Sequence, residues 1–168
     1  MTSLLTGLST FNRPCLAAIQ NRVYLVNNED AVKVMDQASA TNAGIIGPTG
    51  AIGAPTATAG NTTSGVHLFR YRYRNSKTGY ISNPSDALSV TVSGGNGSLR
   101  FDVTTDFVAS SDAKVDTIDV EATAVNDSTY WRAASGLNTA TAITVSISDA
   151  ALTQGINVSA IYGNLQDG

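Results

Sequence analysis

Short β-rich segments separated by turn-forming residues recur over residues 65–148, and this spacing constrains the fold more than any other feature of the sequence. One segment, residues 66–74, alternates aromatic and basic side chains from Phe69 to Arg74. Clusters of Asn, Ser, Gly and Lys at residues 75–79 and 94–97 mark turns between segments. Residues 65–148 lack the apolar period of a helix. The pattern therefore predicts an all-β domain, an antiparallel sandwich or barrel.

The rest of the chain divides into three further segments. Residues 1–36 contain two β-rich runs around a polar turn, which predicts a β-hairpin over residues 21–36. Residues 37–64 carry many Gly, Pro and Ala residues but few large side chains, which indicates an extended linker or docking arm. Residues 149–168 form a polar C-terminal tail, whose first residue, Asp149, is a candidate cap for a short helical turn.

The amino-acid composition and net charge disfavour several kinds of structure and partner. Hydrophobic residues make up 42% of the 168 residues, enough for a buried core, whereas charged residues make up only 14%, which disfavours long surface helices. The net charge of −3 disfavours direct nucleic-acid binding. No apolar run approaches the length of a membrane span and no secretory signal is visible, so we expect synthesis in a cytoplasm and no membrane association.

Residues suited to catalysis are few. His67 is the only histidine and is expected to be a hydrogen-bonded residue at the end of the core face. Cys15 is the only cysteine, which excludes an internal disulfide, and we expect it to be an inert buried thiol. The carboxylates from residue 112 to residue 127 are scattered, without the spacing of a calcium loop. We therefore expect no enzyme, no cofactor and no metal site, and a hydrolase ranks last among the alternatives.

An arginine stripe is the sharpest single feature. Alternation along residues 66–74 predicts a core face and an opposite, outward face. The core face contains His67, Phe69, Tyr71 and Tyr73, and the outward face contains Leu68, Arg70, Arg72 and Arg74. The arginines could contact nucleic acid or a glycan, or they could form a solvated face paired with acids on a neighbouring strand. Asp119 and Glu121 are suitable acids, and the negative net charge favours the second interpretation.

Two aromatic residues complete the set of candidate contact residues. Tyr130 and Trp131 stand together in a β-rich run and could stack on a sugar ring. Packing of Trp131 in the core is the favoured alternative, because sandwiches of this size usually bury one large aromatic side chain. The candidate interaction residues are thus Arg70, Arg72, Arg74, Tyr130 and Trp131.

The order of several short motifs resembles a known module. Asn-Arg-Val-Tyr-Leu at residues 21–25 precedes Gly-Ile-Ile-Gly-Pro-Thr at residues 44–49, and Arg-Asn-Ser-Lys-Thr-Gly-Tyr-Ile-Ser-Asn-Pro-Ser follows at residues 74–85. Over residues 21–155 the chain resembles virion proteins of tailed phages, in which an immunoglobulin-like or fibronectin type III-like sandwich lies near the start of a larger tail or connector protein. It differs where Asp116, Asp119 and Glu121 stand in place of basic residues.

The resemblance implies a structural function. It suggests a virion protein of a phage tail or head–tail connector that assembles with itself and with other virion proteins. The alternative is an adhesion or carbohydrate-binding module with a glycan as its partner. Oligomeric rings in a particle would support the first function, and glycan binding by an isolated monomer would support the second.

Overall fold

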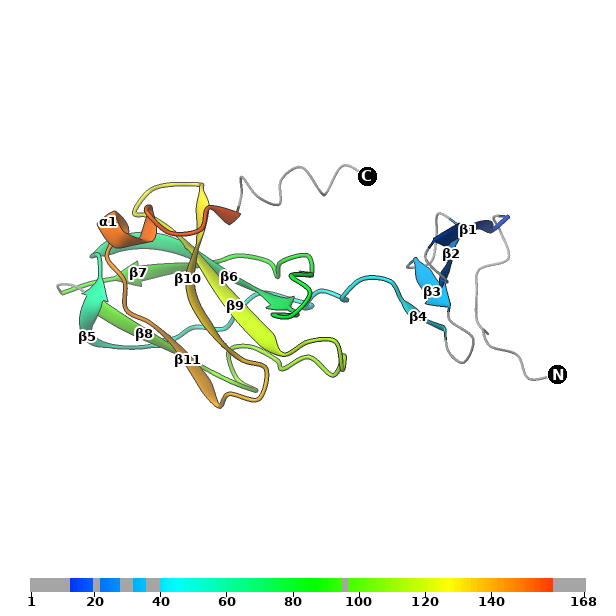
Figure 1. Ribbon diagram of the computed structural model, residues 1–168. Helices are drawn as coiled ribbons and strands as arrows, with labels where there is room; N and C mark the ends of the chain where they lie inside the picture. Colours follow the sequence, from blue (N-terminus) through cyan, green and yellow to red (C-terminus); the bar gives the residue numbers. More distant parts are fainter. Residues whose placement is uncertain (1–12, 20–21, 28–31, 36–39, 95–96, 159–168) are drawn as a thin grey trace. The chain divides into compact units, whose positions relative to one another are not determined.

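The computed structural model describes residues 13–19, 22–27, 32–35, 40–94 and 97–158 (Figure 1). Two compact units are present, an N-terminal unit, Met1–Ile46, and a sandwich unit, Gly47–Gly168. The strands of the N-terminal unit are β1 (Cys15–Ile19), β2 (Arg22–Val26), β3 (Lys33–Met35) and β4 (Ala40–Asn42). The sandwich unit contains β5 (Thr56–Thr62), β6 (Gly65–Arg74), β7 (Leu88–Val92), β8 (Gly97–Asp102), β9 (Thr117–Thr123), β10 (Tyr130–Leu137), β11 (Ala142–Val145) and the helix α1 (Asp149–Leu152).

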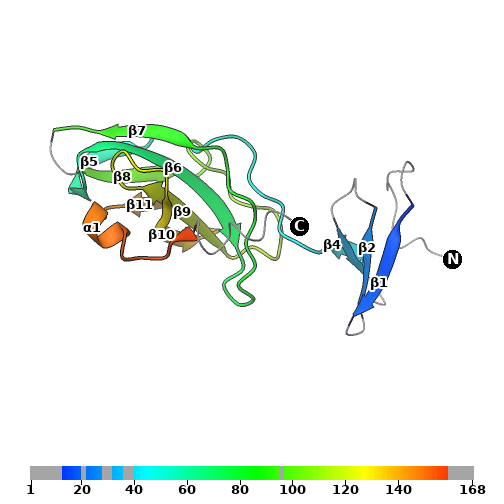
Figure 2. The same cartoon turned by 90° about the horizontal axis from the view of Figure 1, so that it is seen from above.

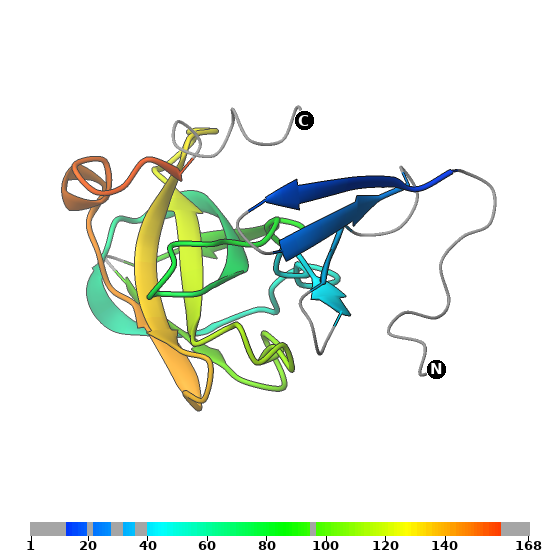
Figure 3. The same cartoon turned by 45° about the vertical axis from the view of Figure 1, so that its right-hand side comes forward.

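The N-terminal unit is one antiparallel sheet with the strand order β1-β2-β3-β4. The pair of β2 and β3, with Val23 opposite Met35, is the hairpin expected over residues 21–36; its turn lies outside the described residues. Sequence analysis did not predict β1 and β4, which extend this hairpin on either side. Figure 3 shows β1, in the darkest blue, at the edge of the sheet beside β2.

The sandwich unit consists of two antiparallel sheets. One has the strand order β10-β9-β6-β7 and the other β11-β8-β5 (Figures 1 and 2). The rings of Phe69 on β6 and Phe101 on β8 lie 5.4 Å apart, so aromatic side chains join the two sheets. The expectation of an all-β fold with antiparallel sheets is confirmed.

Alternation along β6 directs the core side chains as expected. His67, Phe69, Tyr71 and Tyr73 are all buried, and Phe69 is completely so. On β9, Ile118 and its inner-face neighbours Val120 and Ala122 pack in the same core. Every residue of β9 is buried, because this strand lies between β6 and β10 and side chains cover both of its faces.

The sandwich begins earlier in the sequence than expected. Residues 56–62, part of the segment interpreted as a linker or docking arm, form β5, which pairs with β8. Ile52 is 1% exposed, and the N–H of Gly53 donates to the carbonyl of Asp106. Residues 47–64 therefore differ from the expected arm, because pairing with β8 and the burial of one large side chain hold a Thr/Ala-rich segment that has no apolar period.

Two serine side chains form hydrogen bonds with the part of β6 that β7 does not reach. The N–H groups of Tyr71 and Tyr73 donate to the hydroxyl oxygens of Ser85 and Ser82, each at 3.0 Å. The N–H groups of the same serines donate to the carbonyls of Tyr71 and Tyr73. Pro84 lies between the serines and prevents an ordinary strand there, so hydroxyl groups replace the backbone groups that a strand would supply.

The chain beyond β11 covers the outer edge of β10. Ser148 caps α1, and its side chain accepts the N–H of Ala151; the expected cap, Asp149, instead accepts the N–H of Val125 at 2.9 Å. Further on, the carbonyl of Ile156 accepts the N–H of Arg132 at 3.0 Å. The segment after α1 therefore adds backbone pairing to this edge of the sheet.

Candidate interaction surface

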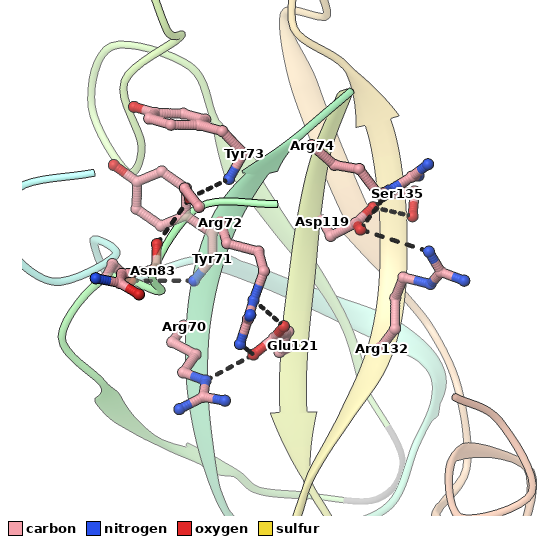
Figure 4. Close-up of polar contacts among 12 residues, drawn as sticks. Arg70, Tyr71, Arg72, Tyr73, Arg74, Asn83, Asp119, Glu121, Arg132 and Ser135 are labelled. Carbon is pink, nitrogen blue, oxygen red and sulfur yellow. Dashed lines mark hydrogen bonds and ion pairs between the residues drawn. The ribbon is translucent and has the colours of Figure 1, made fainter. Parts of the chain in front are cut away.

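Arginine and carboxylate side chains form a layer on the outer face of the four-stranded sheet, which we call the arginine layer. Residues directly opposite in antiparallel strands share a face, and Arg70 lies opposite Glu121 while Arg72 lies opposite Asp119. The third strand, β10, adds two polar residues. The layer comprises Arg70, Arg72, Arg74, Asp119, Glu121, Arg132 and Ser135 (Figure 4).

A β-bulge explains why β10 contributes both Arg132 and Ser135. Simple alternation would place residues three apart on opposite faces. The register shifts between Arg132 and Ala134, so Arg132 lies opposite Glu121 and Ser135 lies opposite Asp119. The extra residue of the bulge thus brings both side chains to the outer face.

Glu121 is the most buried charge in the arginine layer. Its side chain is 0% exposed and pairs with two arginines. Arg70 Nε donates to Glu121 Oε2 at 2.6 Å, and Arg72 Nη2 donates to the same oxygen at 3.1 Å. The side chain of Arg72 is only 4% exposed, so these two charges are paired almost out of contact with water.

Asp119 binds a second set of donors. Arg74 forms a bidentate pair with it, with Nε at 2.7 Å from Oδ2 and Nη2 at 3.0 Å from Oδ1. The hydroxyl of Ser135 donates to Oδ1 at 2.6 Å, and Arg132 Nη1 lies 3.4 Å from Oδ2. This carboxylate links β6, β9 and β10, so the arginine layer joins three strands across their outer face.

The interpretation of the arginine stripe was correct in its pairing and wrong in its exposure. Asp119 and Glu121 are the partners of the stripe, as expected. Arg72 does not face solvent, however, since it is 3% exposed, and the side chains of Arg70 and Arg74 are each 19% exposed. The guanidinium groups are directed mainly at carboxylates of the same sheet, so they offer little to a nucleic acid or a glycan.

The two candidate aromatic residues lie on opposite faces of β10. Tyr130 is opposite Thr123 on the outer face, and the guanidinium carbon of Arg70 lies 3.7 Å from the centre of its ring. Burial raises the pKa of the Tyr130 hydroxyl, while Arg70 acts in the opposite direction. Trp131 is opposite Ala122 on the inner face and is half-buried, which agrees with packing against the core.

The histidine and the cysteine lie in different units and in surroundings of different kinds. His67 is 1% exposed, and its Nδ1 and Nε2 lie 2.8 Å from the carbonyl oxygens of Thr123 and Thr63 respectively. It therefore joins β6 to β9 and to the preceding loop, as a structural histidine does. Cys15 is exposed, which corrects the expectation of a buried thiol, because β1 is an edge strand whose five side chains are all exposed.

An aspartate anchors the turn that follows β6. The N–H and the hydroxyl of Ser76 donate to the two carboxylate oxygens of Asp116 at 2.8 and 2.6 Å. These hydrogen bonds, with a third from the hydroxyl of Thr117, lower the pKa of Asp116 to about 2. The carboxylate thus stays ionised and holds the turn at residues 75–79 against the start of β9.

Edge strand β1 is a second candidate surface, and sequence analysis missed it. All five of its residues are exposed, including Leu16 at 63% and Ile19 at 57%. The sequence of the strand, Cys-Leu-Ala-Ala-Ile, contains no charge. An uncharged β-rich run beside the expected hairpin was the available signal, but short apolar runs alone do not distinguish strand from helix.

Comparison of the chain with protein-family models, with curated proteins and with solved structures gives no match. Within the described ranges, no three His, Cys, Asp or Glu side chains gather closely enough to hold a metal ion. The same part of the chain contains no helix long and apolar enough to cross a membrane. The function is therefore argued from the two surfaces themselves.

Proposed function

We propose that this chain is a structural protein of a virus particle, in a phage tail or head–tail connector, and that it acts by assembling with itself and with other particle proteins. The observation that carries the proposal is the N-terminal unit. Its described strands form one sheet, and the edge strand β1 exposes all of its side chains. So short a chain segment buries little apolar surface, and a partner surface would therefore stabilise it.

The sandwich unit supports the same function in a different way. Its sheets contain four and three strands, all antiparallel, which is the number found in constant-type immunoglobulin domains. The strand orders β10-β9-β6-β7 and β11-β8-β5 differ from those domains, in which the first, second, fifth and fourth strands form one sheet. We therefore propose a sandwich that resembles the immunoglobulin or fibronectin type III kind in the number of its strands and not in their order. The polar groups of its arginine layer are paired within the sheet, which suits a rigid building block better than a ligand-binding face.

The carbohydrate-binding alternative has weaker support. A sugar site needs exposed aromatic faces and polar groups that are directed at the ligand. Arg70 covers the ring of Tyr130, and Trp131 lies on the inner face of the sheet. Tyr80, which is 64% exposed, stands outside the arginine layer on the turn after β6.

The proposal is tested by asking whether purified virus particles contain this chain. Mass spectrometry of purified particles should detect the chain at a fixed copy number per particle. Absence of the chain from particles, together with glycan binding by the isolated monomer on an array, would replace the proposal with the carbohydrate-binding alternative.

A further inference from the structure

Among the described residues, the outer edge of β1 has no partner strand, since β1 pairs only with β2 on its other side. Proteins usually protect such an edge with charges, a bulge or a very short strand. Residues 15–19 have none of these, since the strand has five exposed and uncharged residues in regular register with β2.

The opposite edge of the same sheet differs in each respect. Strand β4 has three residues and a polar end. There, Lys33 Nζ donates to the side-chain oxygen of Asn42 at 2.6 Å, which places a charge beside this edge. The protection is thus present on β4 and missing on β1, so the two edges are not equivalent.

The sequence of β1 is complementary to itself when two copies run antiparallel. With Ala17 on a two-fold axis, Leu16 of one copy faces Ala18 of the other, and Cys15 faces Ile19. Each of these cross-strand pairs puts a large or medium side chain opposite a smaller one. No like charges meet, and Pro14, which has no N–H to donate, limits the pairing to these five residues.

Apolar rows of the sheet also continue across this axis. Leu25, which is buried, lies beside Leu16 within one copy, and Val23 lies beside Ala18. In the paired arrangement these residues form one row, in which Leu25 and Leu16 of one copy are followed by Ala18 and Val23 of the other. A charged or strongly polar partner strand would interrupt this row, whereas a second copy extends it.

We propose that two copies of this chain pair through β1, antiparallel and centred on Ala17, to form one continuous sheet of eight strands. This inference rests on the proposed function, because it names the partner surface through which the subunit assembles. A five-residue strand pair buries less than the roughly 1,200–2,000 Å² of a standard interface. The isolated dimer should therefore be weak, with a Kd of about 0.01–1 mM, and repeated copies in a particle would strengthen it.

The test uses opposite charges on the two-fold axis. Sedimentation equilibrium of the full chain at low ionic strength should show a monomer–dimer equilibrium. Ala17→Lys and Ala17→Glu should each weaken dimerisation up to about five-fold, because like charges then lie directly opposite. An equimolar mixture of the two variants should recover wild-type affinity or better. Thr41→Lys is the matched control, since Thr41 is exposed on the same face and in the same row at the β4 edge.

The outcomes separate the surface from the function. Recovery in the mixture supports pairing at Ala17 and excludes misfolding of the single variants. A wild-type chain that stays monomeric at millimolar concentration overturns the inference, as do Ala17 variants that dimerise like wild type or fail to recover on mixing. In those cases, detection of the chain in purified particles would leave the proposed function standing, and its absence there would remove both.

Discussion

Removal of Glu121 should destabilise the sandwich more than removal of any exposed charge. Glu121→Ala removes the carboxylate that pairs with the guanidinium of Arg72, whose side chain is 4% exposed. Arg70 is affected less, because its side chain is 19% exposed and can turn to water. Breaking a buried pair by removing one partner costs about 3–5 kcal/mol, and we expect a loss of unfolding free energy in this range.

A second substitution separates the effect of the charges on stability from the effect of side-chain packing. In the Glu121→Leu background, Arg72→Met replaces both buried charges with apolar side chains of similar length. Such replacements are often neutral or stabilising, so the double variant should regain most of the stability that Glu121→Leu loses. The coupling between the two positions, obtained from the four-variant cycle, should exceed about 1 kcal/mol.

Urea denaturation followed by tryptophan fluorescence suits this measurement, because Trp131 is the only tryptophan and lies in the sandwich unit. With a denaturant dependence of about 2 kcal/mol per molar urea, Glu121→Ala should lower the midpoint by about 2 M. The control is Arg100→Ala, since the side chains of Arg100 and Asp102 are 56% and 38% exposed and their pair is worth less than about 1 kcal/mol. Equal small effects of both substitutions would refute the burial of the arginine layer.

Three further predictions concern other parts of the sandwich unit. Ser85→Ala leaves a buried N–H of β6 without its acceptor and should cost about 1–3 kcal/mol in urea denaturation, whereas the exposed Ser89→Ala should change stability by less than about 0.5 kcal/mol. Ile52→Ala should cost about 2–5 kcal/mol, because Ile52 is 1% exposed; an unchanged thermal transition would return residues 47–55 to the status of a linker. Because the pKa of Asp116 is lowered, the stabilisation from its hydrogen bonds to Ser76 is fully present above pH 3.8, the ordinary pKa of an aspartate, and is lost as the pH falls towards about 2. A chemical shift of the Asp116 carboxyl that titrates near pH 4 would contradict this prediction.

Alternation along β6 was sufficient to predict which side chains enter the core. His67, Phe69, Tyr71 and Tyr73 are buried because a strand directs every second residue to one face. The partners of the arginines followed from the same period on β9. The burial of Arg72 could not be predicted, since alternation assigns a face but does not show what lies over that face.

Other parts of the fold depend on contacts distant in the sequence. The Thr/Ala-rich strand β5 is fixed by β8, about forty residues away, and its own side chains carry no apolar period. Nothing local to residues 82–85 showed that the hydroxyl groups of Ser82 and Ser85 would accept N–H groups along the edge of β6. The edge strand β1 was missed for the same reason, because its conformation depends on pairing with β2.

The segment after α1 has a consequence for dividing this protein into parts. A fragment that ended at Val145 would contain all seven strands of the sandwich, yet it would lack the carbonyl of Ile156 and the bridge of Asn157 to Trp131. It would also lose the buried side chains of Leu152 and Val158. The shortened sandwich would present the bare side of β10 to its neighbours and would be prone to aggregate. A stable fragment of this unit therefore needs at least residues 47–158.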